Sequence, residues 1–340
     1  MTHLDNRIRW VDTARGLGIL FVIWGHYASD NLADFFYTFH VPLFFVLSGY
    51  LFRIKPEADA KQVLRKLSKS LLIPYFSLGA MMAAAQCLIN YFYKGVRERS
   101  AIARVWTGFL VQNRWTTLWF IAVLFLTEFF FFLMLKFANR REKKNMWLTT
   151  VVLICAVAAS VYYRLGGKSL PWNLDICPMA ILFMHIGYLL RDCSAFQRIV
   201  SSDVKHKLLA AVVFLMLNLT LSRLNCMISG SGEIDMFYNI YGFELVSLPC
   251  AVCGALFVIM LSDIINSKVI TYIGKHSLVY FSLHQMIAIP VSRACIMYFG
   301  LEDINAVVYN ILMLVLSVSM LTAASALMYG TKLKVLLGKY

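Results

Sequence analysis

The sequence predicts an all-α membrane protein, a bundle of about ten transmembrane helices with both termini in the cytoplasm. Of its 340 residues, 60% are hydrophobic and only 15% are charged, and the mean hydropathy is +0.69. A soluble domain carries about 25% charged residues. Apolar runs of about 20 residues, the length that crosses a bilayer, recur along the whole chain. No stretch between them is long enough for a soluble domain, so we expect one membrane domain over residues 1–340.

Ten apolar segments are candidate spans. They cover residues 9–28, 36–53, 70–93, 116–137, 146–164, 173–190, 207–223, 241–264, 277–299 and 305–329. The sixth is interrupted by Asp175 and Pro178, and the seventh is short.

The distribution of basic residues orients the bundle. If the N-terminus is cytoplasmic, 22 of the 32 Lys and Arg residues fall in cytoplasmic segments, nine fall outside, and Arg15 lies in the first span. Short cytoplasmic loops are enriched in Lys and Arg. The net charge of +14 therefore reflects topology, and we expect no nucleic-acid partner. The outside loop 94–115 is the exception, since it carries five cations and two tryptophans; it is either an interfacial helix or a contact for an anionic acceptor.

Cysteine usage indicates no metal site and no disulfide framework. Most of the eight cysteines lie in apolar runs. Cys250 and Cys253 form a C-x-x-C pair, but within an apolar helix that lacks a second ligand pair, so packing is the simpler interpretation.

The first span carries the polar residues that point most directly to function. At about 100° per residue, the eleven steps from Arg15 to His26 bring the two onto one stripe of one helix, about 16 Å apart along its axis. Asp12 lies one turn before Arg15, and Gly18 and Gly25 leave room beside the stripe. Charged and titratable groups are rare in a membrane unless they face a cavity or a partner.

Two roles are open for each of these side chains. His26 titrates near neutrality, so it can accept a proton from a hydroxyl; alternatively it hydrogen-bonds across helices. Arg15 suits a phosphate or a carbonyl oxygen; alternatively it snorkels to the interface and pairs with Asp12.

Further candidates lie in other spans. His40 and Ser48 belong to the second span, Trp119 and Glu128 to the fourth, and His284 to the ninth. Glu128 and His284 are candidate substrate contacts by the same cost argument, and His40, Ser48 and Trp119 are candidate contacts beside them. The alternative for His40, Glu128 and His284 is a structural partner in the bundle, and for Trp119 a place in the interfacial aromatic belt.

The cytoplasmic loop 53–69 could receive a phosphate-bearing donor. It carries Arg53, Arg65, Lys66 and Lys69, and Arg65 and Lys69 are spaced to share one helix face. Ordinary positive-inside charge or contact with anionic lipid explains the same residues. No Gly-rich phosphate loop is present.

Taken together, these residues resemble the acyltransferase-3 family of integral-membrane acyltransferases, and most closely its sugar O-acetylases of the fucose 4-O-acetylase type. The resemblance spans essentially the whole chain and is carried by RWVDTARGLGILFVIWGH, TFHVPLFFVLSGYLF, RKLSKSLLIPY, TLWFIAVLF and IGKHSLVYFSLHQ. The first stretch has the family's Arg followed eleven residues later by His. Lys69 stands where many members have Arg, and we expect no counterpart here of the extracytoplasmic domain that some members carry.

The resemblance implies transfer of an acetyl group from cytosolic acetyl-CoA to a carbohydrate hydroxyl on the other face of a bacterial inner membrane, in polysaccharide biosynthesis. It implies no metal; membrane lipids would surround the chain, and the oligomeric state stays open. The donor phosphates would lie near Arg53, Arg65, Lys66 and Lys69. Arg15 would hold the donor, with Asp12 orienting it, and His26 would act as general base or transient acyl carrier. A transporter or flippase of a sugar-linked lipid is the alternative from another class; acetyl-CoA binding would separate the two.

Overall fold

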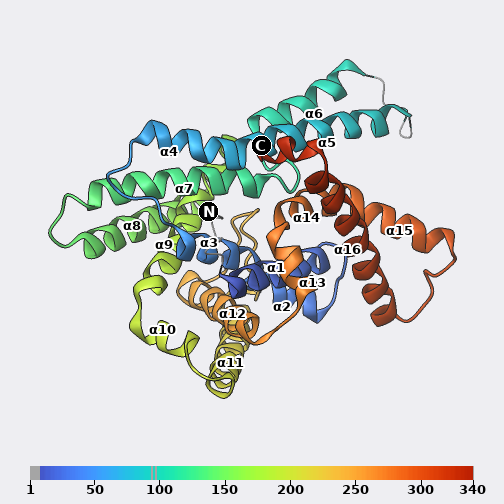
Figure 1. Cartoon of the computed structure of the whole chain (residues 1–340). Coiled ribbons are helices and arrows are strands. Elements are labelled where there is room, and N and C mark those ends of the chain that lie inside the picture. Colours follow the sequence, from blue (N-terminus) through green and yellow to red (C-terminus); the bar gives the residue numbers. More distant parts are fainter. Residues whose placement is uncertain (1–7, 93–94, 96–97, 340) are drawn as a thin grey trace, which may run out of the picture. The chain divides into compact units, whose positions relative to one another are not determined.

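The computed structural model describes residues 8–92, 95 and 98–339, and apart from one short bridge between Asp235 and Ile240 its regular structure is helical (Figure 1). The chain forms two compact units. Unit 1 contains the described residues up to Leu51 together with Gly187–Ser325, and unit 2 contains Phe52–Ile186 together with the chain from Ala326. Arg7, Lys94 and Arg97, which enter the charge count, lie outside the described residues.

Unit 1 holds most of the first two predicted spans and of the seventh to tenth. Its elements are α1 (Arg9–Gly25), α2 (Asn31–Tyr37), α3 (His40–Leu51), α10 (Ser194–Val200), α11 (Val204–Ser229), α12 (Glu244–Ile264), α13 (Lys268–Lys275), α14 (Ser277–Leu283), the π-helix η3 (His284–Ala288), α15 (Ile289–Tyr298) and most of α16 (Ala306–Gly330).

Unit 2 holds the middle spans and the C-terminal turn. Its elements are α4 (Ala60–Leu67), the π-helix η1 (Ser68–Leu72), α5 (Ile73–Phe92), α6 (Arg99–Val111), α7 (Trp119–Ala138), α8 (Lys144–Arg164), the 3-10 turn η2 (Pro171–Asn173), the first part of α9 (Cys177–Asp192) and the 3-10 turn η4 (Lys332–Leu337).

Every predicted span has a helical counterpart, and the all-α membrane character is confirmed. Within the described residues, eight helices are long and apolar enough to cross a membrane, at residues 31–51, 60–92, 119–138, 144–164, 171–192, 204–229, 244–264 and 306–330. The other two predicted spans differ from expectation. Helix α1 has 17 residues and ends at Gly25 rather than at residue 28, and the segment 277–299 is divided into α14, η3 and α15. The count of ten spans and the orientation of the termini therefore stay predictions.

Glycines allow a close helix contact in unit 1, where α13 crosses α1. A Cβ placed on Gly274 would lie 1.7 Å from the carbonyl oxygen of Asp12, and one on Gly16 would lie 2.1 Å from that of Ile270. Neither position therefore tolerates a side chain unless the two backbones separate. Thr13 and Thr271 add a hydroxyl–hydroxyl hydrogen bond of 3.1 Å across the same crossing. Gly18, predicted to leave room beside the stripe, admits the ring of Phe44.

Both π-helical segments precede a proline. Pro74 follows η1 and Pro290 follows η3 by two residues, and in each case the residue after the segment bonds to a carbonyl five positions back. Proline has no N–H and clashes with the carbonyl four residues before it. Widening the turn accommodates that clash, and such π segments are frequent at functional sites. Here they carry Lys69 and His284, two of the predicted site residues.

An ion pair explains the polar break in the sixth predicted span. Asp175 is buried, with 8% of its surface exposed, and its carboxylate accepts a hydrogen bond from the Arg114 guanidinium at 2.7 Å. The loop before it is held by Asn173, whose Oδ1 accepts from the backbone N–H of Arg114 at 3.0 Å. Asp175 therefore fixes the loop ahead of α9 in unit 2. The amphipathic stretch of the loop predicted to lie outside forms helix α6, which lies alongside α5 (Figure 1).

Candidate active site

Helix α1 presents the three polar residues of the first span at different depths. Asp12 is buried, with 2% of its surface exposed, Arg15 is half-buried, and His26 is exposed at the C-terminal end. His26 is the C-cap, and its backbone stays in the right-handed helical region and bonds to carbonyls of the last turn. The helical rotation that joins Arg15 to His26 therefore continues to the cap, although the regular helix stops one residue earlier.

The end of α1 is tied to its neighbours through Asp30. This carboxylate caps α2 by accepting from Ala33 N–H at 2.8 Å, and it also accepts from the indole of Trp24 and the amide of Asn310, both at 3.1 Å. Asp30 thus joins α1, α2 and α16 and fixes the turn that carries His26.

Three histidines from separate elements gather in unit 1, and we call His26, His40 and His284 the histidine cluster. The rings of His26 and His284 lie 4.9 Å apart between centroids. His284 is fully buried and His40 is 4% exposed. The rings of His26 and His284 are therefore neighbours, and His40 lies near enough to both for a charge on one imidazole to act on the others.

Hydrogen bonds fix the tautomer of the two buried members. Nδ1 of His284 faces the carbonyl oxygens of Phe281 at 2.8 Å and Tyr280 at 3.2 Å. Nδ1 of His40 faces the carbonyl oxygen of Phe36 at 2.8 Å. Carbonyls only accept, so each Nδ1 carries the hydrogen and each neutral ring keeps Nε2 as an acceptor. Within the described residues, Nε2 of His284 is buried without a hydrogen-bond partner.

Tyr37 connects the cluster to the end of α1. Its ring meets that of His40 at 4.8 Å in an edge-on arrangement, and its hydroxyl donates to the carbonyl of Gly25 at 3.5 Å. A Cβ on Gly25 would lie 3.1 Å from the Tyr37 ring. Gly25 therefore admits an aromatic ring beside His26, as the spacing of small residues predicted.

The predicted donor residues lie in unit 2, and we call Arg53, Arg65, Lys66 and Lys69 the basic cluster. All four are exposed. Arg65 and Lys66 lie in the last turn of α4, and Lys69 lies in η1. The C-terminal turn packs against η1 and α5, since a Cβ on Gly338 would lie 2.0 Å from the Lys69 carbonyl oxygen and the Ser77 hydroxyl donates to Leu336 O at 2.5 Å. This turn adds the exposed Lys334 and Lys339 to the same unit. They lie far from the loop in sequence, and no spacing indicated them.

The remaining candidates are separated between the two units. Ser48 is half-buried on α3 in unit 1. Trp119, 7% exposed, begins α7 in unit 2, and Glu128 is half-buried two turns further along the same helix. None of these three is a member of the histidine cluster. Their roles as substrate contacts stay predictions.

The histidine cluster has acid–base chemistry and no geometry for a metal. Across the part of the chain that the structure describes, no group of three or more His, Cys, Asp or Glu side chains is arranged to hold a metal ion. Two buried imidazoles with accepting Nε2 atoms beside one exposed imidazole suit proton transfer at an incoming hydroxyl. The fold is thus that of a multi-pass membrane protein, and its histidine cluster has side chains that could move a proton at a hydroxyl.

The family comparison agrees with this class. A family model described as an acyltransferase domain, that of the acyltransferase-3 family, matches residues 8–329. The chain therefore belongs to the acyltransferase-3 family and is a membrane acyltransferase. Searches of curated proteins and of solved structures found no match.

Proposed function

We propose that the protein is an O-acetyltransferase that moves an acetyl group from cytosolic acetyl-CoA to a hydroxyl of a cell-surface or lipid-linked carbohydrate. The observation that carries this proposal is the histidine cluster, in which the exposed His26 lies against the buried His284. An acyltransferase needs a base for the acceptor hydroxyl, and His26 is the exposed imidazole at that centre. The fucose 4-O-acetylase type of sugar transferase is the subtype that the sequence motifs favour.

The proposed chemistry balances with His26 as general base. His26 removes the proton from the acceptor hydroxyl as its oxygen forms a bond to the thioester carbonyl carbon. The carbon–sulfur bond then breaks, and the departing thiolate takes up a proton, leaving the ester on the acceptor. His284 and His40 offer accepting nitrogens that stabilise the protonated imidazole. Transient acylation of His26 is the alternative step.

Two sets of cations are the proposed donor contacts, the basic cluster in unit 2 and Arg15 in unit 1. Arg65, Lys66 and Lys69 are exposed cations suited to the phosphates of a nucleotide carrier. Arg15 lies about 16 Å from His26 by helical rise, a distance suited to a long, thin pantetheine arm. Asp12 would orient Arg15, as predicted.

Replacement of His26 tests the proposal. In cells that express the His26→Ala variant, NMR of surface glycans should show loss of O-acetyl signals, about 10²-fold or more, because removal of a general base costs this much. The matched control is His206→Ala, an exposed histidine at the start of α11. Retained acetylation in His26→Ala, at normal protein levels, would contradict the role of His26.

Acetyl-CoA binding separates the transferase from a transporter. Acetyl-CoA should raise the Tm of the detergent-solubilised protein, since a ligand that binds only the folded state stabilises it. A flippase of a sugar-linked lipid would show no such shift.

We also propose that both termini are cytoplasmic, in the inner membrane of a bacterium. Cys193 and Cys226 are both exposed, and the charge count assigns them to opposite faces. A membrane-impermeant maleimide should label Cys226 in intact cells and Cys193 only after permeabilisation. The reverse pattern would overturn the orientation.

A further inference from the structure

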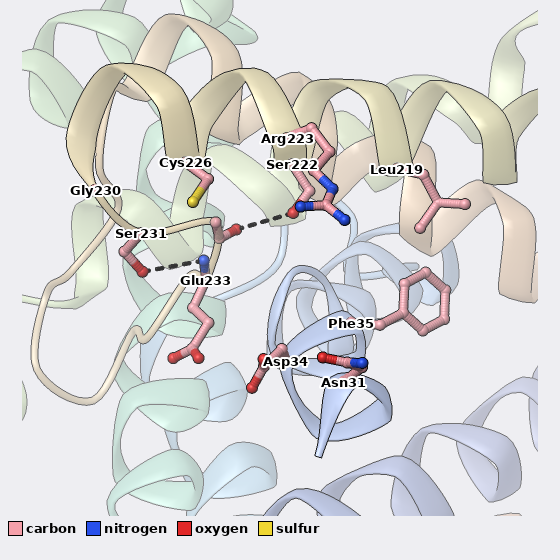
Figure 2. A pocket seen from close by; sticks show the side chains of 11 residues that line it. Asn31, Asp34, Phe35, Leu219, Ser222, Arg223, Cys226, Gly230, Ser231 and Glu233 are labelled. Atoms are coloured by element: carbon pink, nitrogen blue, oxygen red, sulfur yellow. Dashed lines mark hydrogen bonds between the residues drawn. The ribbon is translucent and has the colours of Figure 1, made fainter. Parts of the chain in front are cut away.

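A pocket of about 610 Å³ opens in unit 1 between α2 and α11 (Figure 2). Helix α11 contributes Ser222, Arg223 and Cys226, which lie on one face of the helix, and α2 contributes Asn31 and Asp34. The segment from Gly230 to Glu233 closes one end. Figure 2 shows Arg223 reaching from α11 towards the side on which Asp34 and Asn31 lie.

Hydrogen bonds hold the walls of this pocket in place. Thr38, directly after α2, bonds to Asn218 of α11 at 3.1 Å, and both are buried. Asn225 Nδ2 donates to the Ser231 carbonyl at 3.0 Å, and Ile234 N–H donates to the Tyr37 carbonyl at 3.2 Å. The closing segment is therefore bound to both walls, and the pocket is a built feature of unit 1.

A second pocket of about 450 Å³ continues the first towards the histidine cluster. The two share Asn31, Asp34 and Glu233, and the second reaches Gly25, the residue before His26. Both volumes lie in the range of about 300–1,000 Å³ common for small-molecule sites. A polar groove thus runs from Arg223 to the neighbour of the proposed base, on the face that the charge count assigns to the outside.

The lining of the groove suits a ligand rich in hydroxyl groups. It combines carboxylates, an amide, serine hydroxyls and a guanidinium with the ring of Phe35, which supplies both donors and acceptors. The carboxylates outnumber the cations, since Asp30, Asp34, Glu233 and Asp235 face the groove against Arg223. An anionic ligand would be repelled there.

Asp34 and Glu233 are the carboxylates best placed to bind a ligand. The oxygens of Asp30 are occupied by Trp24, Ala33 and Asn310. Glu233 is half-buried and shares a side-chain hydrogen bond with Asp34; burial, followed by the charges of Asp34 and Asp235 and by this hydrogen bond, raises its pKa above the ordinary value. Carboxylates crowded in this way are stabilised by incoming hydroxyl donors.

We propose that this groove binds the acceptor, and that the acceptor unit is a neutral sugar whose hydroxyls are held by Asp34 and Glu233 while one of them faces His26. The inference rests on the proposed acetyl transfer and adds to it the site and the charge class of the acceptor.

Isosteric variants test the groove in the full-length protein. Asp34→Asn and Glu233→Gln should each lower the O-acetyl content of surface glycans at least tenfold, with acetyl-CoA raising the Tm of the purified variant as much as that of wild type. The matched controls are Asp203→Asn and Glu302→Gln, both exposed and outside the groove, which should keep wild-type acetylation. Cys226→Trp fills the pocket from an exposed position and should behave as the groove variants do.

The outcomes distinguish the two proposals. Wild-type acetylation in Asp34→Asn, Glu233→Gln and Cys226→Trp would overturn the groove as the acceptor site. Loss of the acetyl-CoA shift along with acetylation would also overturn it, because the residues would then serve the donor site or the fold. An acetyl group found by NMR on a uronate, sialate or phosphosugar would overturn the neutral class. If wild-type cells show no gene-dependent O-acetyl signal, the proposed function itself fails.

Discussion

The histidine cluster of unit 1 and the basic cluster of unit 2 place polar groups in opposite environments. His284 and His40 are buried, and backbone carbonyls fix their tautomers. Arg53, Arg65, Lys66 and Lys69 are exposed. A buried polar group needs partners that fix its position, whereas an exposed cation stays hydrated and mobile. The histidine cluster suits a reaction at a fixed position, and the basic cluster suits attraction of a polyanion. We therefore expect variants of the histidine cluster to lower the reaction rate and variants of the basic cluster to weaken donor binding.

The largest difference is expected between two buried histidines. His284→Asn keeps a donor for the Phe281 carbonyl but removes Nε2, and should lower the acetylation rate about 10- to 100-fold, since positioned acid–base groups contribute about 10²–10⁴-fold. His185, 2% exposed in unit 2, bonds to the Thr149 hydroxyl at 2.8 Å. His185→Asn should leave the rate within about twofold and lower stability by about 1 kcal/mol.

The acetylation rates and Tm values of the two purified variants test whether His284 acts in the reaction and His185 only in stability. Equal loss of activity in His284→Asn and His185→Asn would show that a buried histidine matters for folding wherever it lies, and the comparison between the clusters would fail.

Variants of the basic cluster should change donor binding and spare the chemical step. Arg65→Gln and Lys66→Gln should each raise KM for acetyl-CoA about three- to tenfold, since loss of a partly hydrated charged contact costs about 0.6–1.4 kcal/mol. The KM of the wild type should also rise with salt, and that of the double variant should rise less. Lys205→Gln, an exposed lysine in unit 1, is the control. A fall in kcat with KM unchanged would place these cations at the reacting atoms instead.

The smallest expected effect is a pH dependence of stability from Glu233. Its raised pKa means that the folded state holds the proton more tightly than the unfolded state. This contribution is present below the ordinary carboxyl pKa and is lost as the pH rises through the raised value. Glu233→Gln should therefore match wild type near pH 4 and gain about 1 °C or less in Tm at pH 7, because the carboxyl is partly solvated. Thermal scans at both pH values measure this; a Tm below wild type at pH 7 would contradict it.

The sequence predicted the residues whose placement in a membrane is costly. Arg15 and His26 stand out because a charge or an imidazole in an apolar span needs a reason, and helical geometry relates them without further information. The spans, the amphipathic helix α6 and the family resemblance follow from hydropathy and motifs in the same way.

The contacts that complete the site depend on long-range packing. His284 meets His26 across more than 250 residues of sequence, and no local period encodes that pairing. The groove draws on Asp34 and Glu233, which lie in a short helix and an irregular segment between predicted spans, and on Arg223, at the end of the seventh predicted span on α11. Pro74 and Pro290 were the one local signal available for the π segments, since a proline within an apolar helix forces the backbone to adjust.

The two kinds of glycine contact on α1 have a genetic consequence. Gly274 faces the main-chain carbonyl of Asp12, whereas Gly18 faces the side chain of Phe44. A defect from Gly18→Ala should be relieved by a smaller residue at position 44, since the opposing atoms belong to a side chain. A defect from Gly274→Ala should have no such partner, because every residue type has the same carbonyl. In a selection for restored glycan acetylation, revertants of the first allele should include intragenic suppressors, and those of the second should be almost all true reversions.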